Sequence, residues 1–405
     1  MSKLEKFLLL VNATIYVCVA IFSFAYVDLN LTLSKNPNLL GFVNSMQYLG
    51  YYNRPQANLI YIVMIVATHG FFLANLILFL KRKISKKYLF FSSVINIVIL
   101  IFAYPYLSSD IFNYMFDARI IFHYHLSPYT HKALDFPNDD WIRFMRWTHR
   151  YSPYGPAWLL LSLVPYVLGV GKFTLTLLAF KAFISAFHLA NIYLIYQTLK
   201  PKKENIRLAA TALYALNPLI LMEGIINGHN DVVLATFFLL PIYFACKRNA
   251  LKTLTSIVVG ALIKYIPILN LPWYIFYAKI KSFSFQMLLV ANLVTMAIFT
   301  YLFSSFKISA PFVSSGATQI QFQPWYLFWT LPFVALIANT WLSIFFIALA
   351  IGASLRYVPF IYYGDWSHRG TVEFMTIATL APTFIIGLVF LLYKFAQLTH
   401  GEKQK

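Results

Sequence analysis

Side chains able to do acid–base chemistry gather in the segment YLSSDIFNYMFDARIIFHYHLSPY, residues 106–129. Asn113 and Asp117 follow Asp110 by three and seven residues, so a helix that begins at Asp110 carries all three on one face. A carboxylate at a membrane–water boundary can act as a general base, because lost hydration raises its pKa toward the working range. Alternatively, Asp110 or Ser109 only caps that helix. The spacing leaves both interpretations open.

Basic side chains recur through WIRFMRWTHRYSPYGPAW, residues 141–158. They lie three or four residues apart, interleaved with tryptophan, and are Arg143, Arg146, His149 and Arg150. On a helix this spacing forms a basic stripe of the kind that lies in the membrane interface. Arginine binds phosphate through a forked geometry that lysine does not match. The pattern predicts either a site for a lipid phosphate or a surface helix that only contacts anionic lipid.

Polar groups also occur at membrane depth, in NPLILMEGIINGHNDV at residues 217–232. Glu223 lies at the end of an apolar run, and a tight polar turn follows it, containing His229, Asn230 and Asp231. An unpaired charge at this depth costs about 2.5–3.5 kcal/mol, so these groups are expected to face a partner or a cavity. The turn is therefore predicted to pair with the segment 107–155. Because no second histidine follows His229 at four residues, the segment predicts no metal site.

Two further segments place polar groups near the ends of apolar runs. Lys264, in ALIKYIPILNLPW, precedes a proline-broken step and requires an anion or a water path inside the membrane. Alternatively, its ammonium extends to the outer interface. In TQIQFQPWYLFWTLPF, Trp325 and Tyr326 are typical of an aromatic belt at a span end. The glutamines Gln321 and Gln323 are less expected there and could contact a sugar.

The elements that must position these groups are membrane spans. Apolar residues make up 60% of the 405-residue chain and charged residues 11%, whereas a soluble domain has roughly 25% charged residues. Apolar runs of about 20 residues alternate with short basic loops, which is typical of transmembrane helices. This pattern predicts an all-α, polytopic membrane protein with a single transmembrane domain over residues 1–405 and about 12 transmembrane helices. They are expected near residues 7–26, 57–80, 88–106, 173–199, 208–223, 231–246, 252–266, 267–279, 283–304, 324–338, 340–356 and 373–396.

The net charge of +19 does not indicate a nucleic-acid partner, because lysine and arginine are spread over short loops rather than one patch. The basic loops expected on the cytoplasmic side are 81–87, 200–207, 246–252 and 279–281. Alternation then places outside the segments 27–56, 107–172, 224–230, 305–323 and 356–372. Within the long outer segment, 107–155 is the expected catalytic loop. Residues 156–170 are expected to form a re-entrant or interfacial helix, because a full crossing there would put the 200–207 loop outside.

The two cysteines and the first apolar run bear on whether the protein has disulfides, a metal site or a cleaved signal peptide. Cys18 and Cys246 both lie in apolar runs, so neither a disulfide framework nor a metal site is expected. The first apolar run has no convincing small-residue cleavage site and is interpreted as a retained span.

Several of these segments, in this order, resemble motifs of a known enzyme superfamily. They are SDIFNYMFDAR with SPYT, then RYSPYGPAW, NPL with NGHND, LIKYIPIL, and QPWYLFWTLP, and together they cover about residues 105–335. The chain resembles the GT-C glycosyltransferases that use polyprenyl-phosphate sugars. Within them it is most similar to the branch of GPI mannosyltransferase I and the bacterial polyprenyl-phosphomannose-dependent mannosyltransferases. The family often carries two acids as Asp-x-Asp, whereas this chain has Phe112 and then Asn113 after Asp110.

The resemblance implies roles for the groups described above. Asp110 matches the catalytic base, which deprotonates an acceptor hydroxyl for an inverting single displacement at the sugar carbon. The side chains expected to neutralise the phosphate of the donor are Arg143, Arg146, His149, Arg150 and Lys264. Those expected to contact the sugar or the acceptor are Asn113, Asp117, Tyr129, Tyr154, Glu223, His229, Asn230, Asp231 and Gln323.

The same resemblance implies the substrates and the location. The donor is a lipid-linked sugar, with mannose the expected sugar, and the acceptor is a glycolipid or a glycan. Besides this donor and the surrounding membrane lipids, no cofactor and no metal are expected. The protein is expected to be a multi-pass protein of the plasma membrane.

Two other classes of protein share some of these features. A multi-pass lipid or solute transporter (a flippase) would also have many spans and a buried lysine, but inverted repeats and polar groups at the midplane would be expected. Here the polar groups gather toward one side, which favours an enzyme that works at one surface. A non-enzymatic binding or assembly protein would not account for the acidic residue in the long loop.

Overall fold

A computed structural model describes residues 1–29, 31, 35–305 and 322–402 of the chain. Gln321 and most of the predicted outer segment 305–323 lie outside these residues. The described residues form sixteen α-helices with short 3-10 and π-helical segments between them, and they contain no β-strand. The all-α prediction is therefore confirmed for the described part of the chain.

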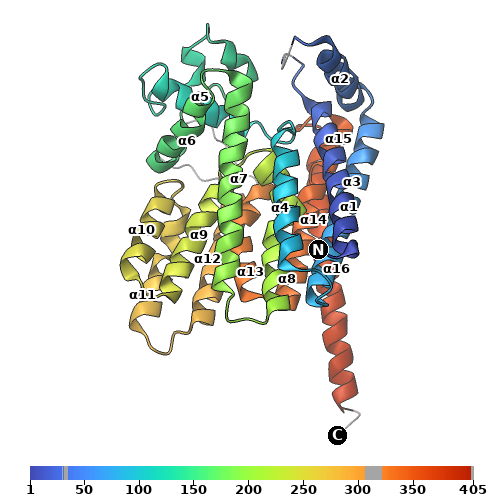
Figure 1. Cartoon of the computed structure of the whole chain (residues 1–405), viewed down its shortest axis with the longest axis vertical. Helices are drawn as coiled ribbons and strands as arrows, with labels where there is room; N and C mark the ends of the chain where they lie inside the picture. The colour runs from blue at the N-terminus through green and yellow to red at the C-terminus, as the bar shows by residue number, and fades with distance from the viewer. Residues whose placement is uncertain (30, 32–34, 306–321, 403–405) are drawn as a thin grey trace.

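Most helices run roughly along the long axis of the molecule (Figure 1). In chain order they are α1 (Lys3–Ser23), α2 (Pro37–Gln47), α3 (Arg54–Leu80), α4 (Lys86–Ile101), α5 (Asp110–Phe122), α6 (Pro156–Leu168), α7 (Phe173–Thr198), α8 (Glu204–Ala215), α9 (Asp231–Cys246), α10 (Ala250–Ala261), α11 (Leu271–Lys279), α12 (Phe285–Ser305), α13 (Leu331–Ile337), α14 (Thr340–Leu355), α15 (Val358–Tyr363) and α16 (Arg369–Glu402).

Five helical segments are long and apolar enough to cross a membrane. They are Lys3–Tyr26, Arg54–Leu80, Phe173–Thr198, Thr340–Tyr363 and Arg369–Phe395. A sixth arises if α8 and the π-helical segment Ile220–Ile226, which are bent by 50° to one another, form one broken span. The other predicted spans correspond to shorter helices such as α9, whose 16 residues rise only about 24 Å against a hydrocarbon core of about 30 Å. The chain is a membrane protein, and the count of twelve spans stays a prediction.

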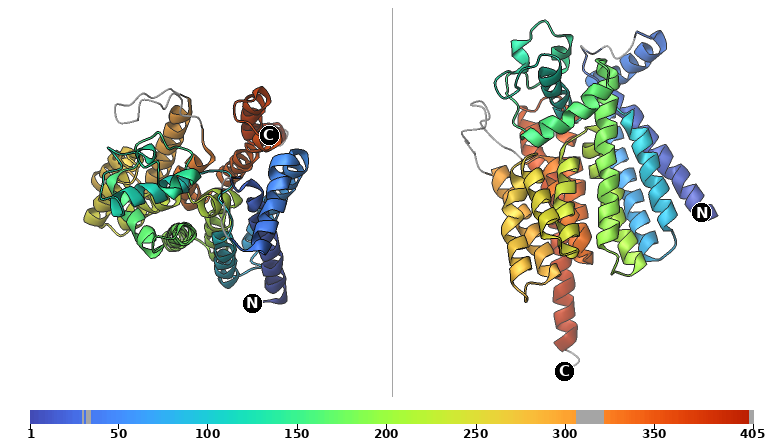
Figure 2. Two further views of the ribbon diagram at one scale, coloured as in Figure 1. Left: turned by 90° about the horizontal axis from the view of Figure 1, so that it is seen from above. Right: turned by 60° about the vertical axis from the view of Figure 1, so that its left-hand side comes forward.

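The helices α2, α5 and α6 lie at one end of the molecule, and the C terminus lies at the other (Figures 1 and 2). The helix α6, which covers most of the predicted interfacial segment 156–170, packs on α5 and α7. Its 13 residues rise about 20 Å, which is too little to cross a bilayer unaided. This end, which contains the 107–155 loop, is called the outer end below, and the opposite end the inner end.

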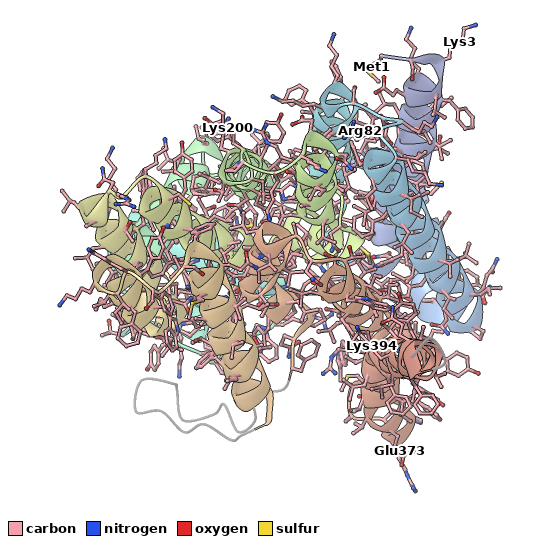
Figure 3. All side chains as sticks on the ribbon, turned by 90° about the horizontal axis from the view of Figure 1, so that it is seen from below. Met1, Lys3, Arg82, Lys200, Glu373 and Lys394 are labelled. Carbon is pink, nitrogen blue, oxygen red and sulfur yellow. The ribbon has the colours of Figure 1, made fainter. Side chains whose placement is uncertain are left out.

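Basic turns occupy the inner end. Figure 3 views the molecule from that side, where the turns with Arg82 and Lys200 lie. Arg82 has a φ of 56°, so the α3–α4 connection reverses in the left-handed region after the last turn of α3. Lysine and arginine gather at this end, and its assignment to the cytoplasmic side stays a prediction.

The prediction of a basic helix over residues 143–150 is wrong. Only Asp140–Phe144 is helical, as a 3-10 turn, which ends at the extended Met145 and is followed by a bend and a turn. The amide of Leu134 donates to the Thr148 carbonyl at 3.1 Å, which fastens this stretch to an earlier part of the loop. Trp141 and Phe144 pack their rings on Phe173 of α7. These contacts with distant residues outweigh the helical spacing, so the four basic side chains do not form one stripe.

Candidate active site

A tight turn joins the π-helical segment Ile220–Ile226 to α9 and lies against the start of α5. Gly228 within it has a φ of 70°, a left-handed conformation that favours glycine. A Cβ at this position would collide with the side chain of Ile111. The Asn227 side-chain oxygen accepts a hydrogen bond of 3.2 Å from the Leu107 amide. The turn and the outer loop therefore meet through backbone and side-chain contacts, in the pairing that the sequence predicted.

Asp110 is the first residue of α5, and its backbone amide donates to the Ser108 hydroxyl at 3.3 Å. The Ser109 side chain makes no capping hydrogen bond. The Asp110 carboxylate instead reaches across to the turn, where Oδ2 lies 3.6 Å from Nδ1 of His229. The side chain is 20% exposed, so it remains accessible from outside. A negative charge at this helix end is favourable, but a capping role alone does not account for its approach to His229.

The His229 ring lies between two carboxylates. Its Nε2 is 3.4 Å from Oε2 of Glu223, on the side opposite to Asp110, and the ring is fully buried. The indole of Trp325 stacks on it with a centroid separation of 3.8 Å. Neither ring nitrogen makes a hydrogen bond within the described residues. Both carboxylates of the Asp110–His229–Glu223 cluster are thus within ion-pair distance of the ring. The two distances leave room to shorten into hydrogen bonds when a substrate binds.

Both oxygens of Glu223 are held in place. Tyr357, which directly precedes α15, donates its hydroxyl to Oε1 at 2.7 Å. The Asn227 side-chain amide donates to Oε2 at 2.8 Å. The Glu223 side chain is 1% exposed, and a carboxylate this deep in a membrane protein requires such partners. Sequence reasoning missed Tyr357, because its partner lies 134 residues away in the chain.

A second buried pair lies beside this cluster. Lys264 Nζ is 2.7 Å from Oδ2 of Asp231, and the two side chains are 17% and 0% exposed. The Trp329 indole donates to the other Asp231 oxygen at 2.8 Å. Asp231 is therefore the anion that the buried lysine was predicted to require. A phosphate contact from Lys264 stays a prediction.

The backbone around Lys264 is joined to the entrance of α6. Gly155 donates its amide to the Ile263 carbonyl at 3.0 Å, and a Cβ at Gly155 would collide with the Leu262 backbone. This approach brings the Tyr154 ring to 5.8 Å from the Lys264 ammonium. The segments RYSPYGPAW and LIKYIPIL, more than 100 residues apart, thus form one side of the site.

Aromatic side chains fill the space between α5 and α6. Tyr114 lies edge-on to Tyr154 and Trp158, with centroid separations of 5.0 and 5.1 Å, and its hydroxyl is 3.4 Å from the Asn230 side-chain oxygen. Tyr129 is exposed and donates to the Tyr154 carbonyl at 2.8 Å. These contacts bring Tyr129, Tyr154 and Asn230 to the wall of the same site.

Two predicted polar residues on α5 lie near that wall. Asn113 is half-buried, and its side-chain oxygen has no hydrogen-bond partner within the described residues. Asp117, one helical turn further, is half-buried as well. Burial raises the pKa of the Asp117 carboxyl to about 7, because desolvation disfavours its charged form. Both share the face of α5 that carries Asp110, as the spacing predicted.

The predicted phosphate-binding residues of the outer loop are not brought against the cluster. Arg143 is paired with the exposed Asp140 at 3.0 Å, Arg150 lies over the Trp147 ring at 4.4 Å, and Arg146 and His149 are exposed. Gln323 is half-buried, two residues before the Trp325 that stacks on His229. Their roles toward the donor are not visible in these contacts and stay predictions.

Other buried charges support the site from a distance. Arg119 pairs with Asp139 at 2.5 Å, which joins α5 to the loop that follows it. Burial raises the pKa of Asp139, but its hydrogen bonds from Arg119, Trp141 and Tyr124 outweigh this and lower the pKa overall. Lys181 of α7 is fully buried and donates to the carbonyls of Leu100 and Ala103, at the end of α4. It satisfies carbonyls that the helix end leaves free, just before the chain enters the outer loop.

No three histidine, cysteine, aspartate or glutamate side chains of the described part of the chain gather in a metal-binding arrangement. A family model described as alpha-(1->6)-mannopyranosyltransferase, N-terminal domain, matches residues 13–281. That range contains the Asp110–His229–Glu223 cluster and the Lys264–Asp231 pair. Searches of curated proteins and of solved structures gave no match.

Proposed function

Since the chain belongs to the alpha-(1->6)-mannopyranosyltransferase family and is a mannosyltransferase, we propose that it takes mannose from a polyprenyl-phosphate donor. The proposed acceptor is a hydroxyl of a glycolipid or glycan at the outer end, and the proposed location is the plasma membrane, with the chain crossing it several times. The transporter alternative is not favoured by a family whose described activity is glycosyl transfer.

One observation carries the choice of base. Among the carboxylates at the site, Asp110 is 20% exposed, whereas Glu223 is 1% and Asp231 is 0% exposed. Glu223 and Asp231 also have both oxygens occupied by protein donors. An acceptor hydroxyl can therefore reach the Asp110 oxygens but not the other two. This accessibility supports Asp110 as the general base.

The proposed reaction is a single displacement. Asp110 accepts the proton of the acceptor hydroxyl, whose oxygen forms a bond to the anomeric carbon of mannose from the face opposite to the phosphate. The bond between that carbon and the phosphate oxygen breaks, and the polyprenyl phosphate leaves with the electron pair, so the configuration inverts. His229, held between Glu223 and Asp110 and stacked on Trp325, orients the base.

Contacts to the substrates are proposed from the same surroundings. Lys264 retains two ammonium hydrogens beyond its bond to Asp231 and is 17% exposed, so it can approach the leaving phosphate. Preorganised positive charge at the atom that becomes an anion lowers a barrier more than most other effects. The rings of Tyr154 and Trp325 offer flat apolar faces of the kind that pack on a sugar.

The test of this proposal is a transfer assay with purified protein in detergent. The protein is incubated with radiolabelled polyprenyl-phosphomannose and host membrane lipids, and the expected result is a new labelled product whose structure names the acceptor. The absence of a labelled product with this donor and with other polyprenyl-phosphate sugars would contradict the proposal. Movement of an intact labelled lipid between leaflets of a vesicle, without a new product, would support the transporter instead.

A further inference from the structure

Within the part of the chain that the structure describes, the cation of Arg356 has no counter-ion. Arg356 follows directly after α14, next to the Tyr357 that binds Glu223, and is only 7% exposed. Within the described residues its guanidinium makes no hydrogen bond and has no carboxylate within ion-pair distance. It lies over the Phe322 ring, whose centroid is 5.8 Å from its Cζ. An arginine that is nine-tenths buried and unpaired is unfavourable unless an anion joins it.

The two fully buried carboxylates of the site are already occupied. Glu223 is held by Tyr357 and Asn227, and Asp231 by Lys264 and Trp329. The third carboxylate of the cluster region, Asp110, is in ion-pair range of His229. The partner of Arg356 is therefore expected to come from outside the chain.

The position of Arg356 indicates which anion this is. Arg356 directly precedes Tyr357, whose hydroxyl binds Glu223, and Glu223 lies beside His229, so Arg356 is next in the chain to a residue that contacts the cluster. Figure 1 shows α15, which begins just after it, at the same end as α5. Bulk lipid headgroups reach exposed cations readily, but a nearly closed position next to a residue that binds the cluster suits a ligand that inserts its anionic group.

We propose that Arg356 binds the phosphodiester of the lipid-linked sugar donor. This rests on the proposed function, and it assigns the phosphate to a residue outside the basic stretch 143–150. The guanidinium offers forked N–H donors to two phosphate oxygens, a geometry that a lysine ammonium does not reproduce. Bound phosphate neutralises the buried charge, and the donor then lies between Arg356 and Asp110.

The test compares Arg356→Met with Arg369→Met. Arg369 is the matched control, because it begins α16 after the same outer connection but its side chain is 90% exposed and paired with Glu373. Short-chain polyprenyl phosphate, without sugar, is added to each purified protein, and the thermal unfolding midpoint is followed as a function of concentration. The wild type and the Arg369 variant are expected to gain stability on binding. The Arg356 variant is expected to bind about 10- to 100-fold more weakly, as for loss of a charged hydrogen-bonded pair.

A purely structural role for Arg356 predicts a different pattern. Removing an unpaired buried cation should leave the midpoint without ligand unchanged or raised, whereas loss of a structural contact should lower it. Arg356→Lys keeps the charge and is expected to fold even if the methionine variant does not. It should raise the donor KM about 10-fold with a smaller change in kcat, since one point charge replaces a fork.

Three outcomes would overturn the inference. They are wild-type affinity in Arg356→Met, no binding of polyprenyl phosphate to the wild type, and equal binding of phosphatidylglycerol through Arg356, which would make this a headgroup site. Transfer measured in parallel separates this inference from the proposed function. Normal transfer with an unchanged donor KM in Arg356→Met would refute only the phosphate assignment, whereas Arg356-dependent phosphate binding without any transfer would refute only the reaction.

Discussion

An ion pair at the inner end and the buried cluster at the outer end hold their charges in opposite ways. At the inner end, Glu204 pairs with Arg207 at 3.3 Å while 54% of the Glu204 side chain stays exposed. At the outer end, Glu223, His229 and Asp231 are at most 1% exposed, and each lies within ion-pair distance of another side chain. Removing a solvent-exposed charge changes the free energy of unfolding little, whereas a buried charge is stable only beside particular neighbours. We therefore expect the Glu204–Arg207 pair to matter little for transfer and the buried outer charges to matter most.

Among substitutions at the two ends, Asp110→Asn is expected to cause the largest loss of transfer activity. The amide keeps the shape of the side chain but cannot accept the acceptor's proton, so kcat should fall about 10²- to 10⁴-fold. The measurement is the initial rate of mannose transfer, with the thermal unfolding midpoint as a check on folding. Asp140→Asn, in the same loop with a side chain that is 87% exposed, is the control and should keep the wild-type rate.

A smaller loss of activity is expected from His229→Gln. Glutamine cannot bridge Glu223 and Asp110 as a ring does, so the base loses its orientation, and kcat should fall about 100-fold. The donor KM should change little, because the phosphate contact is elsewhere. A rise in KM with an unchanged kcat would show that His229 binds substrate and does not position the base.

For stability, the strongest effect is expected from Lys264→Met. Asp231 would be left fully buried without its cation, which should lower the free energy of unfolding by about 3–5 kcal/mol. The double variant Lys264→Met/Asp231→Leu should recover most of this loss, since neither charge remains. Both are measured by unfolding in mixed micelles of rising denaturing-detergent content, and a double variant no more stable than the single one would contradict the pairing.

A pH effect is expected from Asp117. Its folded-state pKa of about 7 lies above the value of an unfolded aspartate, so the folded state binds a proton more tightly. Its contribution to stability is therefore present at low pH and is lost as the pH rises through about 7. Asp117→Asn should flatten the fall of the unfolding midpoint between about pH 4 and about pH 7, the range between the unfolded and folded pKa values. An identical pH profile in the variant would contradict the raised pKa.

The smallest effect is expected at the inner end. Glu204→Gln removes a surface ion pair, which is worth about 0–1 kcal/mol. The transfer rate should not change, and the unfolding midpoint should shift little. A loss of transfer comparable to that of His229→Gln would show that the two ends are not separate in function.

The sequence predicted local features of the site well. The helix beginning at Asp110, the face it shares with Asp117, and the pairing of the NGHND turn with the outer loop follow from spacing and from the high energy of unpaired charge in a membrane. These features depend on a few neighbouring residues. The five long helices were predicted for the same reason, since their apolar length is a local property.

Features that depend on distant residues were not predictable. The basic stretch 143–150 has helical spacing, yet its backbone is fixed by contacts with residues 134 and 173. Tyr357 and Trp329 bind carboxylates 134 and 98 residues away, and nothing in their local sequence names those partners. Arg356 carried a usable signal, because an arginine at the end of an apolar run in a predicted outer segment is not required by the charge rule for cytoplasmic loops.

The most direct test of the account is a cryo-EM structure of the Asp110→Asn variant with polyprenyl-phosphomannose bound. The account predicts mannose at the outer end, beside position 110 and the stacked His229 and Trp325 rings, with the phosphate on the guanidinium of Arg356. Donor bound at the inner end, or at the outer end with its sugar away from position 110, would contradict the assignment of this cluster as the active site.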